Sequence, residues 1–452
     1  MGFTAGLRRH FSALKRGALP SHAVTFQTRS ILARQTLLRV DPPTHGRSIS
    51  TQPKVFPTVG FEKFPADDPI EEERLPGYSP ERYYAAQIGQ VLQDRYQIIG
   101  KLGFGGGSTS GHVATSSTED ALLTIKICTT GERGTRDVLQ EVAVSNHIKS
   151  IDALGHPGKL RLRVVLDSFE VEGVNGNRHR CLVFAPLGQS LTEFRRAFPG
   201  NVLDPDGLRF TLLWVLMGLD FLHQAGVIHT DLSPNNILVS FNPGEERVFE
   251  QIEDLELTNP TPRKVLQDRF IYLSYKLGIS HGPAVITDYG AARLGDPEIN
   301  ERHSGDVMPG TYRAPEIIMG ADWGSKIDMW SLGVMVWDLF EGGPLFRAVS
   351  AKTLDDELHL AEMVSLLGPP PKKFLERHAK SRQYWDSEGN WIASSPIPDQ
   401  SFESRETRLE GQEKQQLLTF VRKVLCWLPE DRKAADQLYD DEFINGYNRH
   451  EG

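Results

Sequence analysis

The most informative part of this sequence is the segment His229-Thr230-Asp231-Leu232-Ser233-Pro234-Asn235-Asn236. Two apolar residues, Val227 and Ile228, precede it, and an apolar run at 237–239 follows it. One carboxylate, Asp231, therefore stands five residues before one amide, Asn236. This spacing lets the carboxylate orient a hydroxyl group while the amide binds a metal ion beside it. A single segment of this kind also arises by chance, so the rest of the chain has to support it.

Composition and charge limit the class of protein. The chain has 452 residues, of which 39% are hydrophobic and 24% charged. This is globular composition with room for two or three folding units. The net charge of −9 argues against nucleic acid as a direct partner and fits a basic substrate. No run of about 18 apolar residues occurs, so we expect no membrane span. The cysteines lack metal-ligand spacing, so we expect reduced thiols at Cys128, Cys181 and Cys426.

The N-terminal region differs from the rest of the chain. Residues 1–50 contain one acidic residue, Asp41, and eight basic ones: Arg8, Arg9, Lys15, Arg16, Arg29, Arg34, Arg39 and Arg47. An Arg-rich, Ser-containing and acid-poor segment is typical of a mitochondrial transit peptide, although a disordered basic tail would have the same composition. We therefore assign 1–55 to a targeting segment or tail. Residues 56–95, which begin Pro-rich and become acidic, form a linker and N-terminal extension.

A second group of residues suggests a phosphate-binding site. The alternating run 96–103 leads into Gly103-Phe104-Gly105-Gly106-Gly107-Ser108, where glycines let backbone N–H groups approach phosphate oxygens. The apolar run 121–128 contains Lys126, whose charge needs a partner if the strand is buried. The helical pattern at 138–148 offers Glu141 as that partner. The alternative is a lysine at the edge of a sheet, with its charge in water.

Together with later motifs, these segments resemble the eukaryotic protein kinases. The first segment is similar to their catalytic loop, H-R-D-L-x-x-x-N, and Asp288-Tyr289-Gly290 to their D-F-G motif. Ala314-Pro315-Glu316 resembles A-P-E, and Arg432 stands where the partner of Glu316 is expected. The resemblance implies an α+β bilobal fold, with a small β-rich N-lobe at 96–187 and a larger helical C-lobe at 188–445. The spacing of apolar residues predicts an amphipathic helix at 206–225, and the resemblance implies a second helix at 326–340.

The resemblance also implies the roles of individual residues with ATP and Mg²⁺. Asp231 would accept the substrate hydroxyl proton, Asn236 and Asp288 would bind the metal, and Lys126, oriented by Glu141, would hold the phosphates. Phe184 would be the gatekeeper, while the Ala185 carbonyl and the Leu187 N–H would bind adenine. The complete set expected to contact the nucleotide is Leu102, Gly103, Phe104, Gly105, Gly106, Gly107, Ser108, Ser110, Lys126, Phe184, Ala185 and Leu187.

Within the kinases, the chain is similar to the SR-protein kinases of the CMGC group, in a short fungal-type variant. The features that carry this likeness are Thr230 in the catalytic loop and the segments 91–103 and 359–371. An insert at about 241–283 separates the two metal-binding motifs. It is polar and contains Pro and Gly, so we expect a surface loop. The family implies Arg-Ser-rich protein substrates held by acidic residues. The acidic residues near the expected positions are Asp355, Asp356, Glu357 and Glu362, and the alternative is that they form a solvated face.

Ser108 and Ser110 depart from the kinase pattern in the glycine-rich segment, and two residues that normally assist the transfer are missing. Ser233 replaces the catalytic-loop Lys, and Pro309 replaces the Thr that normally contacts that Lys. Two hypotheses follow: a monomeric, active serine/threonine protein kinase, or a pseudokinase that serves as a nucleotide-binding scaffold. The family resemblance implies a cytoplasmic or nuclear protein, whereas the N-terminal composition favours mitochondria.

We predict that fusing residues 1–50 to a fluorescent reporter separates the two N-terminal hypotheses. A transit peptide should carry the reporter into mitochondria and be cleaved near Arg47 to Ser50. Microscopy and immunoblotting of the reporter provide the measurement. A matched fusion with the basic residues at 8, 9, 15 and 16 changed to Gln should stay outside. Diffuse or nuclear fluorescence of the unchanged fusion would favour the basic tail.

Overall fold

The first folded unit is a six-stranded antiparallel sheet. The computed structural model describes residues 53–105, 109–116, 121–152, 155–174, 176–296, 302–350 and 353–446. Its sheet has the order β2-β3-β4-β5-β7-β6. The strands are β2 (Val91–Leu92), β3 (Tyr96–Phe104), β4 (Thr109–Ser116), β5 (Leu122–Cys128), β6 (Asp167–Glu172) and β7 (Arg178–Phe184). Residues 1–52 of the predicted targeting segment or tail, and Gly106, Gly107 and Ser108, lie outside the described residues.

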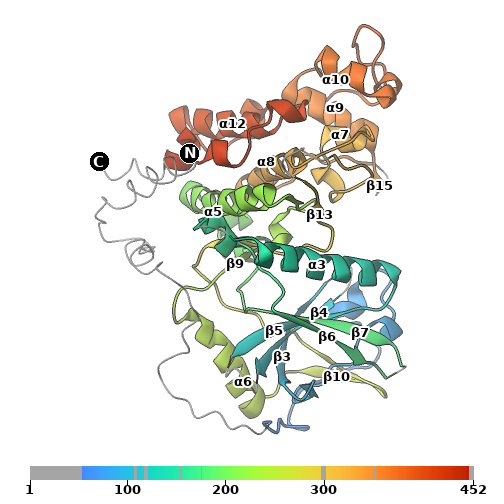
Figure 1. Ribbon diagram of the computed structural model, residues 1–452, viewed down its shortest axis with the longest axis vertical. Helices are drawn as coiled ribbons and strands as arrows, with labels where there is room; N and C mark the ends of the chain where they lie inside the picture. Colours follow the sequence, from blue (N-terminus) through green and yellow to red (C-terminus); the bar gives the residue numbers. More distant parts are fainter. Residues whose placement is uncertain are drawn as a thin grey trace, which may run out of the picture.

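Each face of this sheet has its own apolar cluster, because successive side chains of a strand point to opposite faces. One face carries Ile98 and Ile125, packed with Ala86 and Tyr84 of the N-terminal extension. On the other face, Ile99 packs against residues of the insert. Helix α3 (Glu132–Ser150) lies between the sheet and the helical lobe (Figure 1) and contributes Val138 to a third cluster with β5 and β7.

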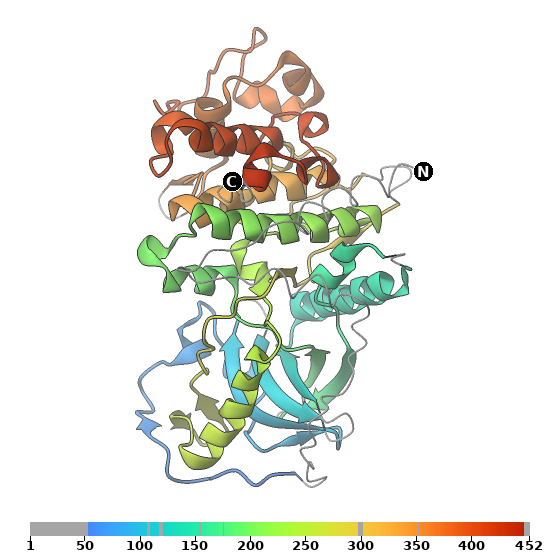
Figure 2. The same cartoon turned by 90° about the vertical axis from the view of Figure 1, so that its left-hand side faces the viewer.

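The insert is a folded segment, and the expectation of a surface loop was wrong. It contains α6 (Val248–Thr258), β10 (Arg263–Val265) and β11 (Phe270–Tyr272). Figure 2 shows α6 lying across the front of the small-lobe sheet. Phe249 and Ile252 of α6 are buried there with Ile99 of β3. The signal for a docked helix in the sequence was the apolar residues of α6, which lie among four acidic ones.

The N-terminal extension is also ordered in part, and it is joined to the insert. Strand β1 (Lys63–Phe64) pairs in parallel with β10, which pairs with β11. Buried ion pairs support this contact: Lys264 lies 2.7 Å from Glu73, and Lys101 of β3 contacts Glu72. Glu256 of α6 bonds Arg263 at 2.5 Å. The acidic run assigned to a linker therefore supplies partners for lysines that are buried in the folded lobe.

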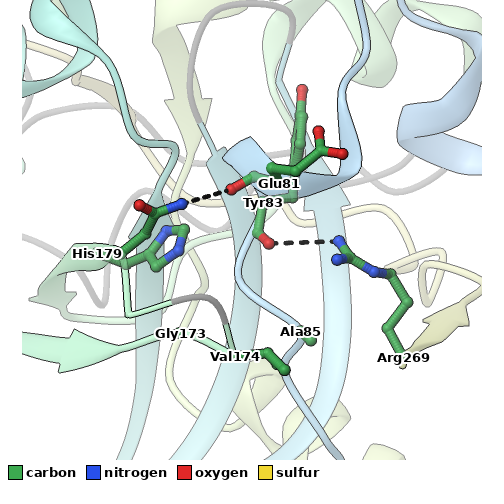
Figure 3. Close-up of a pocket in the computed structure, with 8 residues that line it drawn as sticks. Glu81, Tyr83, Ala85, Gly173, Val174, His179 and Arg269 are labelled. Atoms are coloured by element: carbon green, nitrogen blue, oxygen red, sulfur yellow. Dashed lines mark hydrogen bonds between the residues drawn. The ribbon is translucent and has the colours of Figure 1, made fainter.

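A small hollow marks where three segments of the small lobe meet (Figure 3). The amide of Asn177, in the turn between β6 and β7, donates to the carbonyl of Glu81 at 3.2 Å. Arg269 of the insert donates to the carbonyls of Pro80 at 2.5 Å and Tyr83 at 3.5 Å. These bonds hold the extension at 80–83 between the sheet and the insert.

The large lobe is helical and surrounds one extended apolar core. Its long helices are α5 (Pro205–Gln224), α8 (Lys326–Glu341), α9 (Asp356–Leu367) and α12 (Gly411–Val424). The shorter helices are α4 (Leu191–Phe194), α7 (Pro315–Ile318), α10 (Lys372–Arg377), α11 (Phe402–Arg405) and α13 (Glu442–Asn445). The predicted helices at 206–225 and 326–340 correspond to α5 and α8. No helix in the described ranges has both the length and the apolar character needed to cross a membrane.

Two short antiparallel pairs in the large lobe position the catalytic-loop segment. Strand β8 (Val227–Ile228) pairs with β13 (Arg293–Leu294), and β9 (Ile237–Val239) pairs with β12 (Ala284–Ile286). The loop at 229–236 and the turn at 287–290 therefore begin and end on neighbouring strands. The remaining pair is β14 (Val349–Ser350) with β15 (Thr353–Leu354). The cysteines are free thiols, buried at Cys128 and Cys181 and half-buried at Cys426.

We predict that Ile252→Ala destabilises the small lobe by about 2–5 kcal/mol, because it leaves a cavity between α6 and β3. Ile252 is 3% exposed, and its Cγ2 atom lies within 2.8 Å of an ideal Cβ built on Gly100. Leu255→Ala on the same helix is the matched control, since Leu255 is 47% exposed. Urea unfolding followed by far-ultraviolet circular dichroism gives the comparison. Equal losses from the two variants would show that α6 is not docked as described.

Candidate active site

An ion cluster joins the two lobes at Lys126. Its Nζ atom lies 2.8 Å from Oε2 of Glu141 on α3 and 3.4 Å from Oδ1 of Asp288 in the large lobe. Strand β5 places Lys126 on this side because Ile125 and Ile127 face the sheet core. The sequence predicted the pair with Glu141, and the structure brings both residues together with Asp288. The alternative of an edge-strand lysine does not apply, since β5 is central.

The charges in this cluster stabilise one another. Burial alone would lower the pKa of Lys126, but the carboxylates of Asp288 and Glu141 outweigh it and raise that pKa above its usual value. The ammonium group of Lys126 lowers the pKa of Asp288, against the opposing effect of burial. Burial raises the pKa of Glu141. Asp288 is thus held as a carboxylate, the form that binds a cation.

Asp231 and Asn236 are linked directly in the catalytic-loop segment. The Nδ2 atom of Asn236 donates to the backbone carbonyl of Asp231 at 2.7 Å and to its Oδ2 at 2.9 Å. The amide nitrogen therefore faces Asp231, and the amide oxygen is the atom that would bind a metal. A single 3-10 turn, Pro234–Asn236, sets this arrangement, with Pro at its first position where no N–H is required.

A buried carboxylate holds the start of the same loop. Asp328 of α8 accepts hydrogen bonds from the backbone N–H groups of His229 at 2.8 Å and Thr230 at 2.9 Å. It also contacts His223 at 2.9 Å. Burial would raise the pKa of Asp328, but the bonds from His223 and the backbone keep that pKa below its usual value. Thr230 adopts a left-handed φ of 66°, and its hydroxyl donates to the carbonyl of Ala291 at 2.8 Å.

The segment that carries Asp288 is anchored by its neighbours. The Thr287 carbonyl contacts Nε2 of His229 at 2.9 Å. Tyr289 is fully buried; its hydroxyl donates to the Ile286 carbonyl at 3.0 Å, and its ring meets that of His229 edge-on. Gln140 of α3 donates to the carbonyl of Ala292 at 2.9 Å. The turn with Asp288 is therefore packed against both the catalytic loop and α3.

The expected nucleotide-binding residues lie on β3, β4 and the segment after β7. Leu102, Gly103 and Phe104 end β3 and Gly105 follows it, while Ser110 pairs with Phe104 from β4. Phe184 is 2% exposed, whereas Ala185 is exposed and Leu187 half-buried. Sequence analysis missed Arg163, which donates to the Ala185 carbonyl from Nε at 3.3 Å and Nη2 at 3.1 Å. A charged residue in the apolar run 162–166 was the signal for it.

The donor set fits Mg²⁺ bound together with phosphates. Among the described residues, no group of three or more His, Cys, Asp and Glu side chains could hold a metal on its own. Mg²⁺ in phosphate-transferring sites takes one or two protein oxygens and completes its shell with phosphates and water. The carboxylate of Asp288 and the amide oxygen of Asn236 are of this type.

The segment beyond Asp288 is fixed by a buried ion pair at its end. Arg432 forms two parallel bonds of 2.6 Å with the carboxylate of Glu316, and both side chains are almost fully buried. The predicted pair is confirmed. Trp323 donates to the carbonyl of Gly305 at 3.0 Å, and Tyr312 donates to Asp338 at 2.6 Å. The described part of the segment, 302–316, is held by packing.

The acidic residues proposed for arginine binding are used inside the protein. Asp356 contacts Arg313 and Lys380, and Asp355 caps α9 by accepting from the N–H of Leu358. Glu357 accepts from Ser394 and Ser395, and Glu362 from the backbone N–H groups of Arg347 and Ala348. Asp355, Asp356 and Glu357 are half-buried, whereas Glu362 is buried, so a solvated face is excluded for Glu362.

Comparisons with known proteins support the reading of these motifs. Residues 96–444 match the model of the protein kinase domain. A serine/threonine protein kinase of Aspergillus fumigatus is 36% identical over 405 residues, which cover 88% of this chain and 96% of that protein. The serine/threonine-protein kinase SRPK of Physarum polycephalum is 28% identical and matches 81% of this chain and 89% of its own.

More distant relatives extend the same likeness. The human dual specificity protein kinase CLK1 is 27% identical, over 81% of this chain and 69% of its own. The crystal structure of the PF14_0431 kinase domain shares the fold with a TM-score of 0.61 at 22% identity, covering 80% of this chain and 99% of that one. Nothing in these descriptions favours the scaffold alternative.

We predict that activity does not require phosphorylation of the segment 302–316. Thr230 carries no charge and is already bonded to Ala291, so it cannot attract a phosphate as an arginine would. Ser304 is the exposed hydroxyl of the segment, whereas Tyr312 is buried. Bacterially produced protein should keep its activity after phosphatase treatment, and Ser304→Ala should change it less than twofold. Loss on phosphatase treatment and recovery on preincubation with ATP would contradict this account.

Proposed function

Because the chain belongs to the protein kinase family and is a serine/threonine kinase of the SR-protein-kinase-like type, we propose that five side chains carry its phosphoryl transfer: Lys126, Glu141, Asp231, Asn236 and Asp288. The observation that carries this proposal is the contact of Lys126 with both Glu141 and Asp288. One ammonium group thereby links the helix of the small lobe to the metal-binding motif of the large lobe.

Each of these residues has a defined task in the proposal. Glu141 holds the Lys126 ammonium group in place for the α and β phosphates. Asp231 orients the substrate hydroxyl and accepts its proton late in the reaction. Asn236 and Asp288 would bind Mg²⁺, which when present neutralises charge on the phosphates. The work of the protein is therefore positioning and electrostatic stabilisation.

For the base, we propose contacts with the backbone of Ala185 and Leu187 beside the gatekeeper Phe184. The glycine-containing turn from Gly103 to Ser108, with Leu102 and Ser110 at its ends, would cover the phosphates. The antiparallel pairing of Phe104 with Ser110 supports this, and β4 in turn pairs with β5, which carries Lys126.

The substrate is a protein, and we propose that it is Arg-Ser-rich or otherwise basic. The net charge of −9 and the similarity to SRPK support this proposal. Glu362 is buried and bonds backbone N–H groups within the protein, so we propose that substrate arginines bind carboxylates other than Glu362. We also propose that the kinase acts as a monomer.

The presence of Ser233 and Pro309 affects the turnover rate of phosphoryl transfer and leaves the type of reaction unchanged. A catalytic-loop Lys at 233 would stabilise the transferring phosphate, and loss of such a contact lowers turnover by about 10²–10³. Ser233 is buried and Pro309 begins a 3-10 turn, Gly310–Tyr312. We propose that this kinase works without that contact and is correspondingly slow.

We predict that Asp288→Asn lowers turnover with a basic protein substrate by at least about 100-fold, because it removes the metal-binding charge. Asp254→Asn, an exposed carboxylate on α6, is the matched control and should leave turnover unchanged. Phosphate incorporation at saturating Mg-ATP is the measurement. Circular dichroism and the unfolding midpoint establish that the variants are folded. Wild-type turnover no higher than that of Asp288→Asn would refute the proposed roles.

A further inference from the structure

A guanidinium group lies beside the backbone that the proposed function assigns to the base. Arg163 donates to the Ala185 carbonyl from two nitrogens, at 3.3 and 3.1 Å. Its Cζ atom lies 4.6 Å from the centre of the Phe184 ring. Phe184 and Ala185 are the expected gatekeeper and the first base-binding residue. A cation therefore stands at the inner end of the proposed base site.

The position of Arg163 is fixed by the strand that carries the metal-binding motif. Its backbone N–H donates to the carbonyl of Ile286 at 2.9 Å, and Leu162 forms a parallel bridge with Ile286. Ile286 stands two residues before Asp288. Burial lowers the pKa of Arg163 to about 10, so the side chain stays charged at neutral pH. The carboxylates of Glu141 and Asp288 favour this charge.

A second polar group, the hydroxyl of Thr124, lies on the strand next to Phe184. Thr124 is 8% exposed and pairs with Phe184 across β5 and β7. Its side chain shares a face of β5 with Lys126, because the two residues are two positions apart. Within the described ranges, the Thr124 hydroxyl has no hydrogen-bond partner. A buried hydroxyl without a partner is costly unless a ligand supplies one.

The hydrogen-bonding groups of Arg163 and Thr124 favour a purine with an acceptor at C6. Adenine presents an amino group at C6, which donates, whereas a 6-oxopurine presents a carbonyl oxygen there, which accepts. The guanidinium of Arg163 can only donate, so it opposes an amino group and matches a carbonyl. Paired donation from arginine to O6 and N7 is the commonest specific contact that proteins make with guanine.

We propose that Arg163 makes this kinase accept a 6-oxopurine nucleotide, GTP, as a second phosphoryl donor beside ATP. This inference rests on the proposed function, since it takes the nucleotide to bind along Ala185 and Leu187. Arg163 sets the relative affinity for the two nucleotides by donating to the carbonyl oxygen at C6 of the purine. The Thr124 hydroxyl adds a second polar contact beside Phe184.

The transfer from GTP is chemically the same as that from ATP. The substrate hydroxyl oxygen forms a bond to the γ-phosphorus, and the bond from that phosphorus to the β–γ bridging oxygen breaks. GDP leaves with the electron pair of the broken bond, and the carboxylate of Asp231 accepts the hydroxyl proton. No oxidant or further reactant is needed.

The test compares dissociation constants of Mg-ATP, Mg-GTP and Mg-ITP for the full-length protein, measured by calorimetry. Wild-type protein should bind GTP within about tenfold of ATP. Arg163→Val should raise the ratio of the GTP constant to the ATP constant by roughly 5- to 150-fold. Arg163→Lys, which keeps the charge without the planar fork, should raise it less. ITP, which shares the carbonyl but lacks the 2-amino group, should follow GTP.

The control is Arg161→Val, two residues away. Arg161 lies 4.9 Å from the Trp214 ring, away from Ala185, so its loss should leave the ratio unchanged. If Arg163→Val does not fold, Arg163→Gln and Arg163→Lys provide the ratio. Two results would overturn this inference alone. The first is that the protein binds ATP but no Arg163 variant changes the ratio of the GTP to the ATP dissociation constant. The second is that the wild type binds ATP but not GTP. Failure of the folded wild type to bind any of the nucleotides would overturn both this inference and the proposed function.

Discussion

The catalytic loop depends on one buried carboxylate, that of Asp328. A charge inside the apolar core of α8 is costly unless hydrogen bonds compensate it. Here the backbone N–H groups of His229 and Thr230 provide those bonds. In return, they hold Thr230 at a φ of 66°, which a β-branched residue rarely adopts and which costs about 1–3 kcal/mol. The strained backbone persists because it lets both buried N–H groups donate to Asp328. Without the carboxylate, these two donors would have no partner. The position of the Asp231 side chain thus depends on Asp328, a residue almost a hundred positions later in the sequence.

Much of the fold and of the site could be predicted because the informative residues lie at fixed spacings within regular elements. Lys126 in a strand of apolar residues needed a partner, and α3 supplied Glu141. Asp231 and Asn236 lie in one short loop, so their contact follows from local geometry. Glu316 and Arg432 are 116 residues apart in sequence. Their contact was predictable from the family resemblance, because no local pattern connects residues so far apart.

Other features could not be predicted, because the forces behind them act between distant segments. The insert is polar and contains Pro and Gly, yet Phe249 and Ile252 are enough to dock it once the sheet offers an apolar face. The acidic run before residue 75 resembled a solvated linker, whereas Glu72 and Glu73 are needed by Lys101 and Lys264. Charge composition alone does not distinguish a carboxylate in water from one that pairs with a buried lysine. Targeting by residues 1–50 stays a prediction.

The docked insert also changes how the lobes can move. Its two ends are neighbours in the large lobe, since β9 and β12 pair directly, while Ile252 and Tyr275 lie against β3. In a two-lobed protein joined by one strand, the small lobe can both open and twist about that strand. Here the docked insert adds an attachment to those made by the chain at 184–188, by Lys126 with Asp288 and by Gln140 with Ala292. A motion of the small lobe relative to β9 and β12 would therefore have to pull α6 away from the sheet.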